Sequence, residues 1–210
     1  MIFTHVKNSF LVSVRIYDEV TPPGYWGSGA ENIHVISNFV LGDDLKTILA
    51  YAGSINTWLH LDDNWNDRVH SFEMIQHCNL DMANFLKSKT DMVREVISHT
   101  LQVGLNKVVP SIVRWRVGNC QPPHADKQNV DGSPNSYPEN DIASLVYIND
   151  DYEGGQIYFP NQNLQFKPAS GSLVFFPGDI NYLHGVTEVT KGIRYTMPNF
   201  WSITNTGIVF

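Results

Sequence analysis

The sequence predicts an α+β fold in which an N-terminal helical layer packs on one sheet of a C-terminal β-sandwich of jelly-roll type. Two stretches before residue 108 carry apolar residues at helical spacing. After residue 108, short β-prone runs follow one another without helices between them, which favours a sandwich or barrel over βαβ units. With 42% apolar and 17% charged residues among 210, the chain can form one packed core. We therefore treat residues 1–210 as a single domain, with residues 1–108 as the helical support layer and residues 109–210 as the jelly-roll core.

The N-terminal layer is expected to contain two helices. Residues 1–40 predict one or two strands around a Pro/Gly-rich turn, and residues 42–59 predict a helix with a pair of aspartates at its start. Residues 79–104 predict a longer helix, for which Asn79 is the expected cap. The apolar stripe of this second helix consists of Met82, Phe85, Leu86, Met92, Val96 and Ile97.

Seven short runs after residue 108 predict the strands of the sandwich. Each run is rich in Val, Ile, Tyr, Phe or Thr, and Gly, Pro, Asn and Asp separate the runs. In chain order the runs are VVPSIVRWRV, DIASLVYIND, GGQIYFP, LQFKP, GSLVFFPGD, YLHGVTEV and GIRYTMPNFW.

Composition and charge exclude several classes of protein. The formal net charge of −7 disfavours a non-specific grip on nucleic acid, which needs a basic surface. No window reaches 18 uninterrupted apolar residues, so we expect no membrane span, and the N-terminus lacks the features of a signal peptide. The two cysteines do not suggest a disulfide framework, which favours a reducing cytoplasm. The oligomeric state cannot be derived from the sequence.

Two residues of the segment QPPHAD, His124 and Asp126, have the spacing of a metal-binding pair. In an extended segment, side chains two positions apart point to the same face, so both could reach one ion. Pro122 and Pro123 restrict the backbone and would present His124 rigidly at a strand end. His184 is the best candidate for a third ligand, although a polar residue at a strand end is an equally simple reading. Two histidines and one carboxylate form the facial triad of non-haem Fe(II) oxygenases.

Arg194 lies ten residues after His184, within the run GIRYTMPNFW. Burial of an arginine in an apolar strand is costly unless an anion meets it, and its planar guanidinium suits a carboxylate. An arginine on a solvent face or in a structural salt bridge is the alternative. The neighbouring residues do not settle which face of the strand Arg194 occupies.

These residues, taken in order, resemble the 2-oxoglutarate/Fe(II)-dependent dioxygenases of the prolyl 4-hydroxylase-like branch. The segments RWRVGNCQPPHAD, LVYINDDYEGGQIYFP and FKPASGSLVFFPGDINYLHGVTEVTKGIRYTMPNFW are similar to the approach strand, the central segment and the closing segment of that branch. The similarity covers about residues 109–201. It implies a double-stranded β-helix, the cupin-like form of the jelly-roll.

The resemblance implies cofactors and a role for each matching residue. His124, Asp126 and His184 would bind Fe(II), and Arg194 would bind the distal carboxylate of 2-oxoglutarate. The remaining two residues implied at the co-substrate are Tyr147, whose hydroxyl would help to hold that carboxylate, and Thr196, which forms an Arg-x-Thr pattern. O₂ is the second co-substrate, and ascorbate is a candidate reductant.

Three features depart from the family pattern or extend it. Trp115 takes the place of a family tyrosine, and an indole can donate a hydrogen bond but cannot accept one. Cys120 and Gln121 stand where many relatives carry aromatic residues, so substrate contacts there are expected to differ. Residues 127–141 form a long polar loop directly after the metal motif, and we expect a mobile lid.

The resemblance favours a peptidyl proline as the substrate, in a peptide or protein partner. A free amino acid or another small molecule stays open as the alternative. Nucleic-acid demethylation is disfavoured because Phe200 occupies the position of a second arginine expected in that branch. Two further alternatives are a non-catalytic jelly-roll binding module and a cupin-like metalloenzyme that uses no 2-oxoglutarate. Of Trp26, Trp58 and Trp65, we expect at least two to pack in the core.

Overall fold

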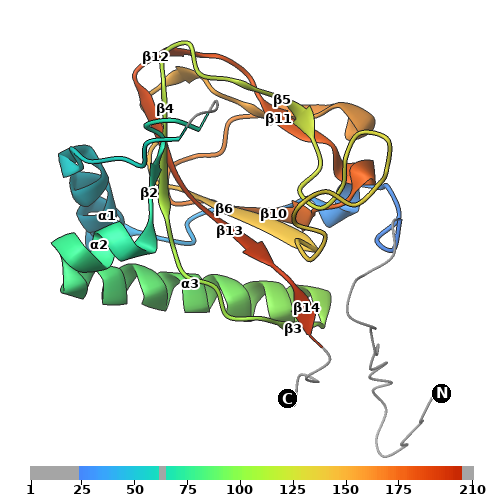
Figure 1. Ribbon diagram of the computed structural model, residues 1–210, viewed down its shortest axis with the longest axis horizontal. Coiled ribbons are helices and arrows are strands. Elements are labelled where there is room, and N and C mark those ends of the chain that lie inside the picture. Colours follow the sequence, from blue (N-terminus) through green and yellow to red (C-terminus); the bar gives the residue numbers. More distant parts are fainter. Residues whose placement is uncertain (1–23, 62–64, 205–210) are drawn as a thin grey trace, which may run out of the picture.

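Two antiparallel sheets face one another, and three helices cover the outer side of the larger sheet (Figure 1). The computed structural model describes residues 24–61 and 65–204. The predicted jelly-roll with helices on one sheet is therefore confirmed. Any strand in residues 1–23 lies outside the described residues.

The larger sheet has six strands and the smaller has four. In spatial order the larger sheet consists of β1 (His34–Ile36), β10 (Leu173–Pro177), β6 (Ile142–Tyr147), β13 (Ile193–Trp201), β4 (Ile112–Arg116) and β2 (Val69–His70). The smaller sheet consists of β5 (Gln121–His124), β11 (His184–Val186), β8 (Ile157–Phe159) and β9 (Leu164–Phe166). Two further pairs join β12 (Val189–Lys191) to β7 (Glu153–Gly154), and β14 (Ile203–Thr204) to β3 (Gly104–Leu105).

All seven runs predicted as strands contain one, in chain order β4, β6, β8, β9, β10, β11 and β13. The first 108 residues also contribute to the larger sheet, because β1 pairs with β10 and β2 pairs with β4. β1 lies within residues 1–40, where one or two strands were predicted. β2 was not predicted, because two residues are too few to show the alternation of a strand.

The helices differ from the prediction mainly at their ends. The first, α1 (Gly42–Ser54), ends five residues before the predicted boundary at residue 59. The residues that follow, Ile55, Asn56 and Thr57, are β-branched or short polar residues with low helix propensity. A further helix, α2 (Phe72–Cys78), was not predicted, because seven residues are too few for a clear apolar stripe. Short 3₁₀ segments occur at Ala30–Asn32, Pro160–Gln162 and Ile180–Tyr182.

The long helix α3 (Leu80–Leu101) confirms the predicted cap but shifts part of the predicted stripe. The Asn79 side chain accepts a hydrogen bond from the Met82 backbone nitrogen at 3.0 Å. Met92, predicted to face the core, is 42% exposed, and Val93 is buried in its place. Five residues of α3 are fully buried: Ala83, Leu86, Thr90, Val93 and Ile97. The predicted residues Met82, Phe85 and Val96 pack against the same cluster and are partly buried, so Met92 is the member of the predicted stripe that departs from it.

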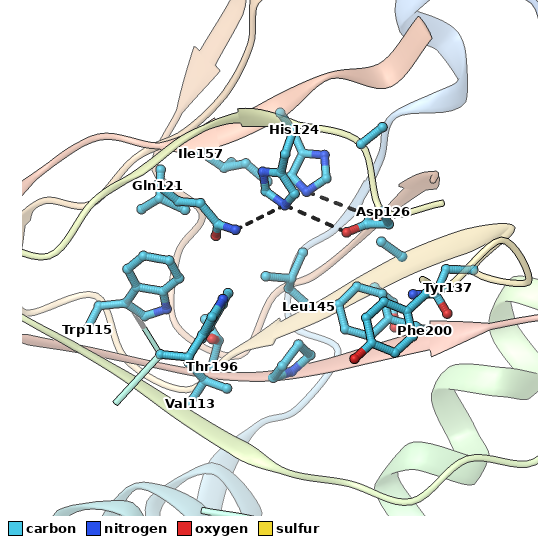
Figure 2. Close-up of a pocket in the computed structure, with 18 of the residues that line it drawn as sticks. Val113, Trp115, Gln121, His124, Asp126, Tyr137, Leu145, Ile157, Thr196 and Phe200 are labelled. Atoms are coloured by element: carbon cyan, nitrogen blue, oxygen red, sulfur yellow. Dashed lines mark hydrogen bonds and ion pairs between the residues drawn. The ribbon is translucent and has the colours of Figure 1, made fainter. Parts of the chain in front are cut away.

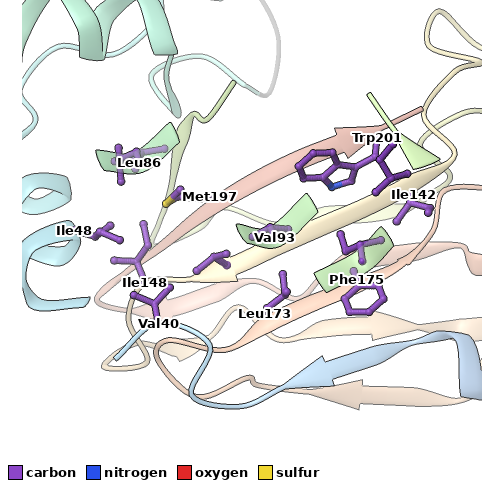
Figure 3. Close-up of a cluster of buried hydrophobic side chains, with 14 of the residues drawn as sticks. Val40, Ile48, Leu86, Val93, Ile142, Ile148, Leu173, Phe175, Met197 and Trp201 are labelled. Atoms are coloured by element: carbon purple, nitrogen blue, oxygen red, sulfur yellow. The ribbon is translucent and has the colours of Figure 1, made fainter. Parts of the chain in front are cut away.

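The larger sheet is buried on both faces. Alternate residues of its central strands, such as Ile142, Val146 and Phe175, meet the helices in one apolar cluster. Figure 3 shows Ile142, Ile148, Leu173 and Met197 of this cluster between the sheet and the helices. The intervening residues of the same strands face the smaller sheet in a second cluster, whose members are Ala143, Tyr147, Ile157, Phe159, Val174, Phe176 and Tyr182. The functional residues therefore lie on a support that is packed from behind.

Neither a disulfide nor a membrane-spanning helix contributes to the described structure. Cys78 and Cys120 are both free and exposed. Within residues 24–61 and 65–204, none of the helices combines the length and the apolar character needed to cross a membrane.

Candidate metal centre and co-substrate cavity

A cavity of about 490 Å³ lies between the two sheets and contains the predicted site (Figure 2). Its walls include His124, Asp126 and His184, together with Arg194 and Thr196 from β13. In Figure 2, His124 and Asp126 lie on one side of the cavity, and Trp115 and Thr196 lie on the other. Residues from separate parts of the chain thus meet in one enclosed space.

Strand pairing brings His124 and His184 together. The segment that contains Pro122 and Pro123 forms β5, which ends at His124, as the two prolines predict. His124 is directly opposite His184 in the pairing of β5 with β11. Asp126 follows the strand, and its backbone nitrogen donates to the carbonyl oxygen of Gly178 at 2.9 Å. A Cβ atom at Gly178 would lie 3.3 Å from the Asp126 Cβ and would collide with the Asn140 carbonyl oxygen, so glycine permits this close approach.

The three side chains have the geometry of a metal-binding group. The Nε2 atoms of His124 and His184 each lie 3.7 Å from a carboxylate oxygen of Asp126. One ligand atom from each residue falls within 4.8 Å of the others. The two imidazole rings have centroids 4.4 Å apart. A single ion between these atoms could contact all three.

Backbone carbonyl groups orient the two histidine rings. Nδ1 of His124 donates to the carbonyl oxygen of Pro122 at 3.2 Å, and Nδ1 of His184 donates to that of Tyr182 at 3.1 Å. In a neutral ring this leaves Nε2 without a proton, which is the form that binds a metal. The Gln121 side-chain nitrogen lies 3.2 Å from Nε2 of His124 and can donate to it.

Burial sets the protonation of the site. It raises the pKa of Asp126 to about 6, with a smaller opposing effect from His124. It also lowers the pKa of His184 to about 4. The pKa of His124 is lowered too, first by burial and then by His184. At neutral pH the site therefore contains two neutral imidazoles and one carboxylate, which are the ligand forms that a divalent metal needs.

The Asp126 carboxylate also has an unsatisfied oxygen that a bound cation would satisfy. Oδ2 of Asp126 is buried and has no hydrogen-bond partner among the described residues. A buried carboxylate oxygen without a partner is costly, and a bound cation would remove that cost. Two imidazole nitrogens and one carboxylate oxygen suit Fe(II), and they leave other coordination positions open.

Arg194 faces the cavity and is fully buried, at 0% exposure. Its Nη2 atom donates to the Tyr147 hydroxyl at 3.0 Å. The guanidinium lies over the rings of Trp115 and Tyr147, at 5.2 and 4.9 Å from their centroids. Its Nε and Nη1 atoms have no hydrogen-bond partner in the described part of the chain. A buried cation with two unused donors is an incomplete carboxylate site.

Two of the predicted co-substrate residues are in place beside Arg194. Thr196, at 1% exposure, lines the cavity from the same face of β13. Tyr147 contacts the guanidinium but is not among the described residues that line the cavity. Trp115 does line it and contributes a ring face to Arg194. At the position where the family pattern has a tyrosine, the indole thus offers Arg194 a cation–π contact.

The Gly-Gly pair allows the chain to pass close to Arg194. Both glycines have positive φ, at +70° for Gly154 and +59° for Gly155. A Cβ atom at Gly155 would lie 3.3 Å from Cδ of Arg194 and 3.1 Å from a ring carbon of Tyr152. Tyr152 is buried, and burial raises the pKa of its hydroxyl to about 12. Sequence reasoning did not single out Tyr152, because a tyrosine in a turn has no distinguishing spacing.

An ion pair links the two ends of the loop of residues 127–141. Lys127 and Asp141, both buried, form an ion pair at 2.6 Å. Oε1 of Gln128 accepts from the Ile180 backbone nitrogen at 2.8 Å. Tyr137, further along the loop, lines the cavity. The loop therefore borders the site as expected, and its movement as a lid stays a prediction.

The three tryptophans of the N-terminal part divide between core and cavity. Trp58 is buried in the helix-side cluster, and Trp26 packs against the clusters on both sides of the sheet. Trp65 lines the cavity, where its ring lies 5.5 Å from that of Trp115 in an edge-on arrangement. Two tryptophans thus pack in the core, in agreement with the prediction.

Comparisons with known proteins agree with this geometry. A family model described as "2OG-Fe(II) oxygenase superfamily" matches residues 110–202, which contain the three candidate ligands and Arg194. Human prolyl 3-hydroxylase 3 is 33% identical over 91 residues, or 38% of this chain and 12% of that protein. The chain thus spans about one eighth of the length of the prolyl 3-hydroxylases that it matches.

Solved structures show the same fold at low sequence identity. A Pseudomonas putida prolyl-4-hydroxylase has a TM-score of 0.61 and 15% identity, and covers 81% of this chain and 92% of that one. A Trichoplax adhaerens prolyl hydroxylase, in complex with a hypoxia-inducible-factor peptide fragment, has a TM-score of 0.59 and 19% identity. This match covers 81% of this chain and 83% of that one.

Proposed function

We propose that this chain, whose residues 110–202 match a family model of the 2OG-Fe(II) oxygenase superfamily, is a 2-oxoglutarate-dependent hydroxylase that acts on a peptidyl proline. One observation carries the proposal. A single cavity contains both the His–Asp–His group and a fully buried arginine with two unused donors. A binding module that had lost catalysis would have no need for both.

In the proposed site, His124, Asp126 and His184 hold Fe(II). These three residues would supply two imidazole nitrogens and one carboxylate oxygen, and such a ligand set would leave coordination positions for the co-substrate and O₂. When bound, iron and 2-oxoglutarate supply the oxidising chemistry that places a hydroxyl group on the substrate carbon. The protein contributes fixed ligand orientation, through the carbonyl groups that accept from both Nδ1 atoms.

Arg194 is the proposed anchor for the distal carboxylate of 2-oxoglutarate. The Tyr147 hydroxyl and the rings of Trp115 and Tyr147 hold its guanidinium in place before any ligand arrives. The free Nε and Nη1 donors are then available for a carboxylate, and Thr196 is placed to add a hydroxyl contact. A preorganised cation of this kind orients the co-substrate without a further entropic cost.

The cavity mouth supports a proline-containing peptide as the substrate. Tyr137 and Phe200 line it and are 61% and 42% exposed, and Trp65 is a further aromatic residue of the cavity wall. Aromatic grooves are a common means of binding proline-rich segments. The Trichoplax adhaerens prolyl hydroxylase forms a complex with a hypoxia-inducible-factor peptide fragment, and that protein has the same fold as this chain.

The first experiment is an anaerobic titration of the metal-free protein with Fe(II) and then 2-oxoglutarate. We expect a weak visible charge-transfer band from the chelate. The band should be lost in His184→Ala and should need far more 2-oxoglutarate in Arg194→Ala. A folded protein that gives no band would contradict the proposed cofactors.

A second experiment addresses the substrate. The loaded enzyme is incubated with proline-rich peptides and, separately, with free proline, and the products are analysed by mass spectrometry. Fragment spectra and amino-acid analysis then show whether C3 or C4 of the ring carries the hydroxyl group. Hydroxylation of free proline alone would favour the small-molecule alternative.

A further inference from the structure

A second hollow, of about 440 Å³, lies beside the mouth of the cavity. It is bordered by Lys87 of α3, by the segment of residues 107–111 before β4, and by Pro198–Phe200 of β13. Pro198 and Phe200 also line the first cavity, so the two spaces share a wall. A chain leaving the first cavity over Phe200 would enter this hollow.

An interruption of strand pairing creates the hollow. β13 pairs with β4 from Ile193 to Thr196, and the next inward-facing position of β13 is Pro198, which has no backbone N–H. Pro110 stands on the opposing segment and lacks a donor as well. The two segments come together again where Ser202 and Asn106 exchange hydrogen bonds and Ile203 pairs with Leu105. Between these points, one side of β13 has no strand partner within the described residues.

The wall of the hollow includes a buried polar side chain without a hydrogen-bond partner among the described residues. Asn199, at 3% exposure, lines it, and neither its side-chain nitrogen nor its side-chain oxygen has a partner in the part of the chain that the structure describes. A buried amide without partners is costly, and both of its groups match those of a peptide or a carboxylic acid.

The charge of the hollow is opposite to that of the whole chain. Lys87 and Lys107 line it, and no Asp or Glu does so among the described residues, although the chain has a formal net charge of −7. Lys87 pairs with Asp91 at 3.1 Å on the helix surface. Lys107 is exposed and forms no ion pair within the described ranges. The local field therefore favours an acidic group.

We propose that this hollow is a second contact site for the peptide substrate, and that it binds an acidic side chain a few residues away from the hydroxylated proline. This inference rests on the proposed function and adds a determinant of specificity to it. Pro198 and Phe200 line both spaces, so a peptide that crosses Phe200 passes from the first cavity into the hollow within a few residues. Lys107 supplies the attraction, and the Asn199 amide bonds the peptide at the floor of the hollow.

The test uses paired peptides that differ at one position. A proline-rich peptide carries Glu or Gln at each of the five positions on either side of the proline, and the KM of each is measured with the iron- and 2-oxoglutarate-loaded enzyme. We expect Glu at one or two positions on one side to lower KM by about fivefold relative to Gln. Lys107→Glu should reverse that preference and favour a peptide with Lys at the same position.

Two matched variants complete the design. Lys46→Glu makes the same charge change on α1, where Lys46 is exposed and pairs with Asp43, and it should leave the preference intact. Asn199→Asp adds a negative charge inside the hollow and should weaken the binding of Glu peptides but not of Gln peptides. Equal KM values for Glu and Gln peptides in the unaltered enzyme, or a preference that survives Lys107→Glu, would overturn the inference.

Failure of this inference can be distinguished from failure of the proposed function. The affinity for 2-oxoglutarate, read from the charge-transfer band, should be the same in Lys107→Glu as in the unaltered protein. Hydroxylation of peptides without charge preference removes the second site and leaves the proposed function standing. Absence of the band removes the proposed function, and a band without hydroxylation of any peptide removes the peptide substrate and the second site with it.

Discussion

The two faces of β13 differ in how completely their buried polar groups are hydrogen-bonded. On the helix side, Met197 and Trp201 pack among apolar neighbours, and the Trp201 indole donates to Ser144 at 2.8 Å. On the cavity side, Arg194 is as deeply buried, yet two of its donors have no partner among the described residues. Apart from Asn199, which lines the second hollow, the first face stabilises the fold, whereas the second retains unpaired donors that a ligand can complete. The difference indicates where binding is expected on a strand that is buried throughout.

The largest expected effect comes from removing a candidate metal ligand on the cavity side. Asp126→Ala should abolish metal binding and lower turnover by at least about a thousandfold, since the metal supplies the chemistry. The metal-free protein should be as stable as before or more so, because a buried carboxylate with an unpartnered oxygen is removed. Isothermal titration with Fe(II) and thermal unfolding measure the two outcomes.

Asp131→Ala is the matched control for this variant. Asp131 lies in the loop beside the site and hydrogen-bonds Ser133. Metal affinity and turnover should be retained. If Asp126→Ala bound Fe(II) as the unaltered protein does, the assignment of Asp126 as a ligand would be wrong.

The helix side of β13 should respond in the opposite way. Met197→Ala leaves a cavity in the core and should lower the free energy of unfolding by about 2–5 kcal/mol. The affinity for 2-oxoglutarate should change little in the folded variant, because Met197 faces away from the cavity. Urea unfolding and the charge-transfer titration, made on one sample, separate the two effects. A large loss of co-substrate affinity at unchanged stability would contradict the proposed difference between the two faces of β13.

Arg194→Met tests the unpaired donors directly. Methionine retains much of the apolar volume but removes the charge, and the affinity for 2-oxoglutarate should fall by about a hundredfold through loss of charge-assisted hydrogen bonds. Fe(II) binding in the absence of 2-oxoglutarate should be unchanged. The affinity of Arg194→Lys for 2-oxoglutarate should lie between those of the unaltered protein and Arg194→Met, because a lysine presents its charge without the planar pair of donors.

The binding of the metal should depend on pH. Asp126 must lose its proton to bind a cation, and burial raises its pKa to about 6. His184, whose pKa is lowered to about 4, stays neutral over the range from 6 down to 4. Metal affinity should therefore be constant above about pH 6.5 and fall about tenfold per unit below pH 6. Titrations with Mn(II) between pH 5 and 7.5 measure the slope, and a flat profile would contradict the raised pKa.

Tyr147→Phe should have the smallest effect. It removes the hydroxyl that accepts from Arg194 at 3.0 Å and keeps the ring that lies against the guanidinium. The loss of about 1 kcal/mol corresponds to about a fivefold rise in the KM for 2-oxoglutarate. A hundredfold effect would mean that the hydroxyl contacts the co-substrate itself.

Local patterns predicted much of the fold. The β-prone runs after residue 108 and the Asn79 cap depend on a few neighbouring residues, and the structure contains them. The helix boundaries, α2 and β2 were missed or misplaced. These elements are short or frayed, and contacts with distant segments, not local propensity, stabilise them.

Sequence by itself determined the identity of the candidate ligands, since His124 and Asp126 lie two positions apart and Arg194 interrupts an apolar run. Only the tertiary structure decided that His184 lies opposite His124, and that Arg194 faces the cavity rather than solvent. It also decided that Lys87 and Lys107, from separate segments, meet beside Asn199. Spacing along the chain fixes which side chains share one strand face. Pairing between strands far apart in sequence, which depends on register and on where proline interrupts it, fixes which faces meet.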